Sequence, residues 1–158
     1  MKVYLIYMAR KLRIEYGGAV YHLMSRGNGK QDIFHDAKDR KMFTKALGEA
    51  CEKTGWRVYE YCLMSNHFHI CLETPQPNLV AGMKWLLGTY STRFNKRHNR
   101  VGHLFAGRYK SLIVDGSNRG YLHKVCDYIH LNPVRAKLLT QEQTLKDYPW
   151  SSYPTYLL

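Results

Sequence analysis

Two strand-like runs separated by only two residues constrain the fold of this chain more than any other feature. Residues 56–64 and 67–74 are both rich in aromatic and branched side chains. Only Ser65 and Asn66 lie between them. A connection this short joins antiparallel neighbours, because parallel strands need a crossover of a dozen or more residues. The sequence therefore predicts a β-hairpin and, with it, an antiparallel sheet.

Hydrophobic periodicity and turn residues predict the other elements. In chain order they are a strand over 19–25, a helix from a cap at Asp36 to a stop at Gly55, the hairpin, a helix over 79–100, a strand over 109–115 and a helix over 118–131 that ends before Pro133. This order predicts an α+β fold. We expect a ferredoxin-like split βαβ antiparallel sheet, with helices mainly on one face and an added C-terminal helix.

The length of 158 residues is that of one ordinary domain, so we expect a single domain over 1–158, with 145–158 as a tail. Residues 1–8 are either an edge strand or an extension before a start at Met8. Their apolar run is too short to cross a membrane and no cleavage site follows it. The four cysteines form no CxxC pair. We therefore expect a cytoplasmic protein with reduced cysteines and no membrane partner.

The charge balance favours a polyphosphate partner. Lys and Arg number 24 against 12 Asp and Glu, which gives a formal net charge of +12. A basic protein without such a partner is the alternative. The candidates for DNA binding are Arg26 and Asn28 in a glycine loop, Arg93 and Arg97 on one edge of the second helix, and Arg108 and Lys110 beside the fourth strand. A solvated helix face is the alternative for the helical pair.

Two histidines occupy one face of the predicted strand 67–74. Alternation along a strand puts His67 and His69 on the same side, opposite Phe68, Ile70 and Leu72. Two imidazoles this close can converge on one divalent ion, although a third donor is then required. Two ordinary, half-exposed histidines are the alternative.

The last predicted helix carries a tyrosine and an amide four residues apart. Tyr128 and Asn132 therefore lie along one edge of the helix, beside an apolar stripe that includes Val125 and Ile129. A phenol is a weak nucleophile at neutral pH, and a divalent ion at a phosphodiester would compensate for this. Asn132 is the candidate third ligand, with Glu73 in reserve. The alternative is that Tyr128 is one of 13 tyrosines that serve in packing.

Taken together, these motifs resemble those of the single-tyrosine HUH transposases, in particular the REP-associated tyrosine transposase branch. The similarity extends over about residues 9–155, and its segments are 13–16, 19–22, 25–28, 66–73, 108–111, 127–134 and 148–153. One departure is Gly17-Gly18, where the family often has a proline.

The resemblance implies a metal-dependent single-stranded DNA endonuclease and strand transferase. It implies that His67 and His69 hold Mg²⁺ or Mn²⁺, with Asn132 as third ligand. It also implies that Tyr128 forms a 5′-phosphotyrosine intermediate, with hairpin-forming repeats as the DNA. Family members are monomers or homodimers, and the sequence does not decide between them. The alternatives are a non-catalytic nucleic-acid-binding protein of ferredoxin-like fold, a domesticated or inactive transposase, and a phosphoesterase that uses water and does not need Tyr128.

Overall fold

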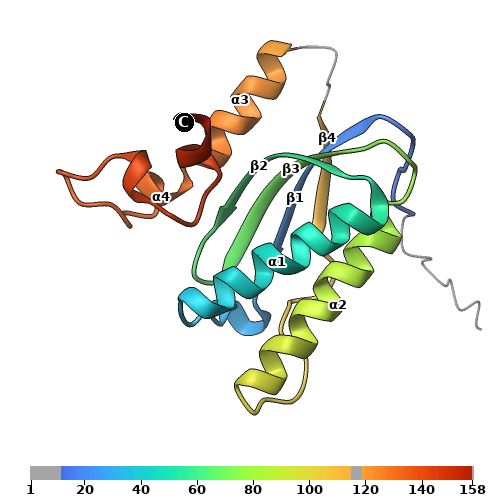
Figure 1. The fold of residues 1–158 in the computed structure, drawn as a ribbon, viewed down its shortest axis with the longest axis horizontal. Coiled ribbons are helices and arrows are strands. Elements are labelled where there is room, and N and C mark those ends of the chain that lie inside the picture. The colour runs from blue at the N-terminus through green and yellow to red at the C-terminus, as the bar shows by residue number, and fades with distance from the viewer. Residues whose placement is uncertain (1–11, 115–118, 158) are drawn as a thin grey trace, which may run out of the picture.

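The structure is a computed structural model that describes residues 12–114 and 119–157 (Figure 1). Its elements are β1 Ala19–Arg26, η1 Asn28–Lys30, α1 Ala37–Thr54, β2 Arg57–Leu63, β3 His67–Thr74, α2 Leu79–Arg97, β4 Lys110–Val114, α3 Arg119–His130, α4 Asn132–Arg135, η2 Leu145–Asp147 and η3 Tyr153–Leu157. The predicted extension over 1–8 and the predicted boundaries at 115 and 118 lie outside the described residues.

The four strands form one sheet in the order β2-β3-β1-β4, with every neighbouring pair antiparallel. The split βαβ arrangement follows from this order, because β3 lies between β2 and β1 while α1 crosses over to join β1 to β2 (Figure 1). The predicted α+β, ferredoxin-like fold is confirmed.

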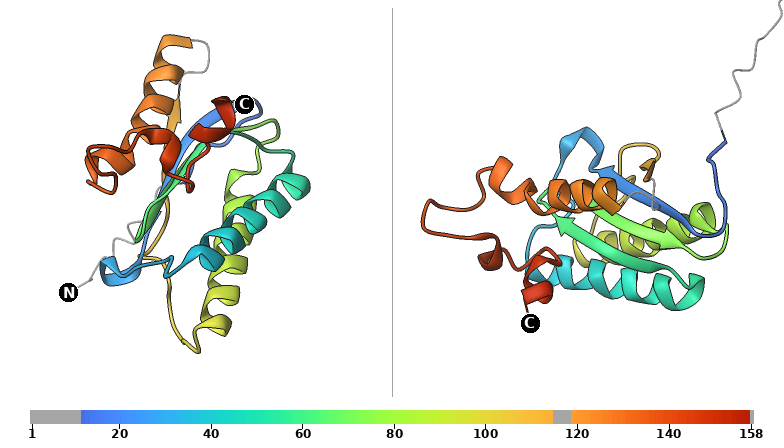
Figure 2. Two further views of the ribbon diagram at one scale, coloured as in Figure 1. Left: turned by 60° about the vertical axis from the view of Figure 1, so that its left-hand side comes forward. Right: turned by 90° about the horizontal axis from the view of Figure 1, so that it is seen from above.

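Helices cover the two faces of the sheet unequally. α1 and α2 lie side by side on one face, whereas α3 and the C-terminal segment lie on the other (Figure 2). The larger core lies under α1 and α2 and includes Phe68, Ile70 and Leu72, as the alternation in β3 predicted. A smaller core under α3 includes Cys71 and Ile129. The sheet therefore separates a thick hydrophobic layer from a second face that has less apolar cover.

Local signals set the ends of α1 as predicted. Asp36 caps the helix by accepting a hydrogen bond from the Asp39 N–H at 3.0 Å. Gly55 ends it with a positive φ of 74°, a conformation that glycine adopts without strain. The predicted helix over 79–100 was three residues too long at its C-terminal end. α2 ends at Arg97 rather than Arg100, because Asn99 takes a left-handed φ of 50° after the cap.

A β-bulge in β2 joins the sheet to α3. The register shifts between Val58 and Glu60, and Glu60 pairs with Cys71 on the face that α3 covers. The buried Glu60 side chain contacts Nε2 of His130 at the end of α3. It also accepts a hydrogen bond from the Ser152 hydroxyl at 2.6 Å. One buried carboxylate thus ties the sheet, the end of α3 and the C-terminal segment together.

Within the described parts of the chain, every helix is too short or too polar to cross a membrane.

Candidate functional site

Three histidines lie on the face of the sheet that α3 covers. The register of β1 against β3 pairs Met24 with His69 and His22 with Cys71, so His22, His67 and His69 all point to this side. We call this side of the sheet the histidine face. The two predicted metal ligands are therefore neighbours of a third imidazole from an adjacent strand.

The rings of these histidines are in contact with one another. Ring centroids are 5.1 Å apart for His67 and His69, and 5.2 Å apart for His22 and His69, whose ring planes differ by 28°. The Nε2 atom of His22 lies 2.9 Å from the Nδ1 atom of His69, a hydrogen-bond distance.

Tyr128 faces this cluster from α3. Its ring centroid lies 6.0 Å from that of His69 and 5.9 Å from that of His22, both in edge-on geometry. A hollow of about 350 Å³ separates α3 from the sheet here. We call it the tyrosine hollow, and the residues that line it are His22, Met24, His69, Leu112, Tyr121, Lys124, Val125 and Tyr128. The sequence-predicted tyrosine and histidines are thus brought together.

The packing of α3 leaves Tyr128 accessible. Ile129 is fully buried, and Leu122, Val125 and Cys126 pack beside it against the smaller core, as the apolar stripe predicted. Tyr128 itself keeps 42% of its surface exposed. The amphipathic pattern of α3 therefore buries one stripe and presents the tyrosine at its edge to the hollow.

Burial keeps the three imidazoles neutral. It lowers the pKa of His69 to about 3, with smaller contributions from His22 and His67. Burial also lowers the pKa of His22, and burial together with the charge of Arg26 lowers the pKa of His67. A neutral imidazole is the form that binds a metal ion. The donor set of the histidine face thus fits a divalent cation.

The hydrogen atom of His67 can be assigned from its neighbours. The Asn66 side chain donates from Nδ2 to the Lys30 carbonyl at 3.1 Å, which turns its Oδ1 toward His67. This oxygen lies 2.8 Å from His67 Nδ1. Because an amide oxygen only accepts, Nδ1 carries the hydrogen and Nε2 is the atom with a free lone pair. His67 can therefore bind a metal ion through Nε2.

Asn132, the candidate third ligand, is buried at the start of α4. Its amide nitrogen donates to the carbonyls of Tyr128 at 2.9 Å and Ile129 at 3.1 Å, and so provides hydrogen-bond donors for the last carbonyl groups of α3. The side-chain oxygen is the atom that could bind a metal ion. Among the described residues, Asn132 is not one of those that line the tyrosine hollow. The reserve candidate, Glu73, accepts a hydrogen bond from the Tyr59 hydroxyl at 2.6 Å.

The candidates for DNA binding lie in several parts of the structure. Arg26 pairs with His67 in the register, and Lys110 pairs with Met24 in the row of His69, so both belong to the histidine face. Asn28 is exposed in η1, directly after β1. Arg108 lines a different hollow, together with Arg13 and Tyr21.

The helical pair lies on the opposite face, on α2. Arg93 forms an ion pair with Glu49 at 2.7 Å. Arg97 forms ion pairs with both Asp36 and Asp39. These two arginines therefore join α2 to α1 and are not brought together with the histidines.

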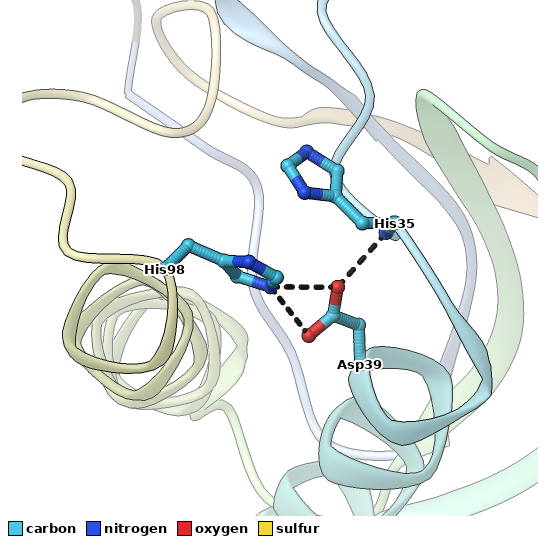
Figure 3. A group of neighbouring side chains, drawn as sticks. All are labelled: His35, Asp39 and His98. Carbon is cyan, nitrogen blue, oxygen red and sulfur yellow. Dashed lines mark hydrogen bonds and ion pairs between the residues drawn. The ribbon is translucent and has the colours of Figure 1, made fainter.

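A second group of possible metal ligands lies where the start of α1 meets the end of α2 (Figure 3). His35, Asp39 and His98 are the one set of three such side chains in the described chain whose ligand atoms all lie within 4.8 Å of one another. This His-Asp-His group could bind a metal ion. Its carboxylate already accepts hydrogen bonds from His98, from the His35 N–H and from Arg97. The hydrogen-bonding capacity of the Asp39 carboxylate is thus used within a network of contacts that joins the two helices.

Three residues of the histidine face are absent from the sequence-based site. His22 and Lys124 line the tyrosine hollow, and the Arg135 guanidinium lies 4.6 Å from the centroid of the Tyr128 ring. The placement of His22 depends on the register between β1 and β3, which local sequence does not encode. Lys124 precedes Tyr128 by one helical turn, so helical spacing was the one signal that pointed to it.

The chain is similar to known proteins in sequence and in fold. A family model described as "Transposase IS200 like" matches residues 16–132. The structure reported as "Structure of the REP associates tyrosine transposase bound to a REP hairpin" is 15% identical with a TM-score of 0.75, over 95% of this chain and 86% of that chain. A crystal structure of a proposed transposase from Deinococcus radiodurans r1 is 19% identical with a TM-score of 0.52, over 76% of this chain and 97% of that chain. No curated protein matches the chain.

Proposed function

This chain belongs to the family of IS200-like transposases, and from that premise we propose that it nicks and rejoins single-stranded DNA through Tyr128. The family predicted from the sequence is confirmed, and the fold shared with the REP-associated tyrosine transposase supports the predicted branch. We propose hairpin-forming repeat DNA as the substrate and the cytoplasm as the place of action.

The observation that carries this proposal is the position of Tyr128 across the tyrosine hollow from His69 and His22. An exposed phenol beside neutral imidazoles matches what a phosphodiester-cleaving site needs, namely a nucleophile next to a cation-binding group. Tyr128 differs in this from Tyr21 and Tyr90, whose rings are buried in the larger core.

The residues of the histidine face fit a divalent ion. His67 and His69 would hold Mg²⁺ or Mn²⁺, with the Asn132 side-chain oxygen as the proposed third donor. A divalent ion held there would supply positive charge for the non-bridging phosphate oxygens. Hard, oxygen-preferring cations suit a site where phosphate supplies further ligands.

The proposed reaction conserves phosphodiester energy. The Tyr128 hydroxyl oxygen attacks phosphorus, the new oxygen–phosphorus bond forms the 5′-phosphotyrosine, and the bond to the 3′ oxygen breaks. The phenol loses a proton and the departing 3′ oxygen gains one. The same 3′-hydroxyl, or another, can attack the phosphotyrosine and release Tyr128, so rejoining needs no external energy source.

The proposed DNA path follows the histidine face. Arg26 and Lys110 flank the histidines on the sheet, Lys124 lines the tyrosine hollow from α3, and Arg135 lies over the Tyr128 ring. Four cations around one nucleophile can neutralise successive phosphates of a strand that crosses it. Asn28, next to Arg26, is the proposed neighbour of the DNA at the glycine loop.

The test is a covalent adduct between the protein and DNA. End-labelled single-stranded hairpin DNA is incubated with the protein and Mg²⁺ or Mn²⁺ and run on a denaturing gel. We expect an adduct with the wild type and with Tyr121→Phe, which alters the other tyrosine of the hollow, and none with Tyr128→Phe. DNA binding without an adduct would identify a non-catalytic binder, and cleavage without an adduct would identify a phosphoesterase that uses water.

A further inference from the structure

His22 is the one histidine of the cluster to which the proposed reaction assigns no task. It is half-buried in the middle of β1, and its ring contacts two groups of the site. It lies edge to edge with the His69 ring and edge-on to the Tyr128 ring. Its Nε2 atom is 2.9 Å from His69 Nδ1.

The hydrogen bond between the two rings restricts what each nitrogen can do. One of the two atoms must donate, and the other must accept. If His69 Nδ1 donates, Nε2 of His69 keeps a free lone pair. His67 has this same arrangement, because Asn66 Oδ1 takes the hydrogen of its Nδ1. Both ligand histidines would then present equivalent Nε2 atoms.

We propose that His22 is the positioning residue of the metal site: its Nε2 accepts the Nδ1 hydrogen of His69 and so fixes the ring and tautomer in which His69 Nε2 binds the ion. Partners of this kind raise the basicity of a ligand imidazole and hold its orientation. The inference deepens the proposed function and rests on it.

A direct ligand role for His22 fits the geometry less well. Its Nε2 is engaged with His69. Among the described residues, the three histidines do not form a group whose ligand atoms all lie within 4.8 Å of one another. His22 therefore acts through His69.

The test measures Mn²⁺ binding by calorimetry, without DNA, for four forms of the full chain. They are the wild type, His22→Ala, His22→Gln and His103→Ala, in which an exposed histidine of the connection between α2 and β4 is removed. We expect His22→Ala to weaken Mn²⁺ binding about 10- to 100-fold. His22→Gln should stay within about threefold of the wild type, because the glutamine oxygen can accept the same hydrogen. His103→Ala should bind as the wild type does.

Two further measurements separate positioning from a general effect on folding. Nitrogen-15 spectra of the imidazoles should show His69 protonated on Nδ1 in the metal-free wild type and in His22→Gln, and a mixture of tautomers in His22→Ala. Saturating Mn²⁺ should restore most of the adduct formation of His22→Ala, and thermal unfolding of the metal-free variants checks that they are folded.

The outcomes distinguish this inference from the proposed function. Unchanged Mn²⁺ affinity in His22→Ala, equal losses in the Ala and Gln variants, or a His69 ring protonated on Nε2 would each overturn the role of His22. The metal site of the proposed function would instead be overturned if the wild type did not bind Mn²⁺, or if His67→Ala bound Mn²⁺ as tightly as the wild type does.

Discussion

The guanidinium of Arg135 lies over the aromatic ring of Tyr128, with its central carbon 4.6 Å from the ring centroid. The two residues come from different helices, α3 and α4, which meet at the capped turn around Asn132. A cation held over the ring of the proposed nucleophile is placed to stabilise negative charge on the phenol oxygen and on the phosphate that it attacks.

Arg135→Gln should therefore lower the rate of adduct formation at saturating DNA by about tenfold or more, because a fixed positive charge next to the reacting phosphate is lost. Single-turnover kinetics on a denaturing gel would measure this rate. Lys41→Gln, which removes an exposed charge from α1 on the other face of the sheet, is the control and should leave the rate unchanged. Equal rates for wild type and Arg135→Gln would remove Arg135 from the site.

The salt dependence of DNA binding should separate the two sets of cations. Arg26→Gln and Lys110→Gln should each reduce the slope of log K against log salt by about 0.7, the value for one contact with a single strand. Arg93→Gln should leave the slope unchanged, since Arg93 is paired with Glu49 on the opposite face. Fluorescence anisotropy over a series of salt concentrations measures the slopes. A smaller slope for Arg93→Gln would instead place DNA along the edge of α2.

The ion-pair network between α1 and α2 should make stability depend on pH below about 4. Hydrogen bonding by Arg97 lowers the pKa of Asp36. Burial alone would raise the pKa of Asp39, but hydrogen bonds from His98, the His35 N–H and Arg97 hold it below its usual value. Carboxyls with lowered pKa values stabilise the fold above the pKa of the unfolded chain, and this contribution is lost as pH falls through the lower folded value.

Arg97→Met should accordingly lower the free energy of unfolding at pH 7 by about 1–3 kcal/mol, as expected when a buried carboxylate loses a charged partner. The difference from wild type should shrink as pH falls below about 4, because the carboxyls of the unfolded chain then become protonated while those of the folded wild type, with their lowered pKa values, still hold their charge. Urea unfolding at pH 7, 5 and 3 would show this, with Lys41→Met as a control that changes little. A difference that stays constant with pH would contradict the assignment.

Two glycines of α2 should respond to alanine with opposite signs. A Cβ atom on Gly82 would lie 2.1 Å from the Trp56 ring, whereas nothing lies within 4 Å of one on Gly88. Gly82→Ala should destabilise the protein by about 1–3 kcal/mol through overpacking, and Gly88→Ala should stabilise it by about 0.5–1 kcal/mol through helix propensity. Thermal unfolding measures both. If Gly82→Ala were as stable as Gly88→Ala, the packing of Trp56 on α2 would differ from that described.

Signals that act over a few residues made much of the fold predictable. The cap at Asp36, the stop at Gly55 and the short connection after β2 are each local, and they appear where the sequence placed them. The apolar stripe of α3 was predictable for the same reason, and it brings Tyr128 to the histidines.

What the sequence did not show depends on contacts between distant segments. His22 joins the cluster only through the register of β1 on β3, which is set by packing across the whole sheet. Arg97 looked like a free cation because its partner Asp36 lies 61 residues earlier in the chain. Charge and periodicity indicate which residue types could form a site, but the tertiary fold decides which residues pair over such separations.

The alternation of side chains along β1 and β3 limits how the sequences of related proteins can diverge. Because side chains alternate strictly along β1 and β3, mutations under α1 and α2 can repack one layer without moving His67 or His69 on the other. A single-residue insertion or deletion within either strand would exchange the two faces and destroy the core and the site together. Related sequences should thus drift freely in residue identity while the lengths of these two strands stay fixed.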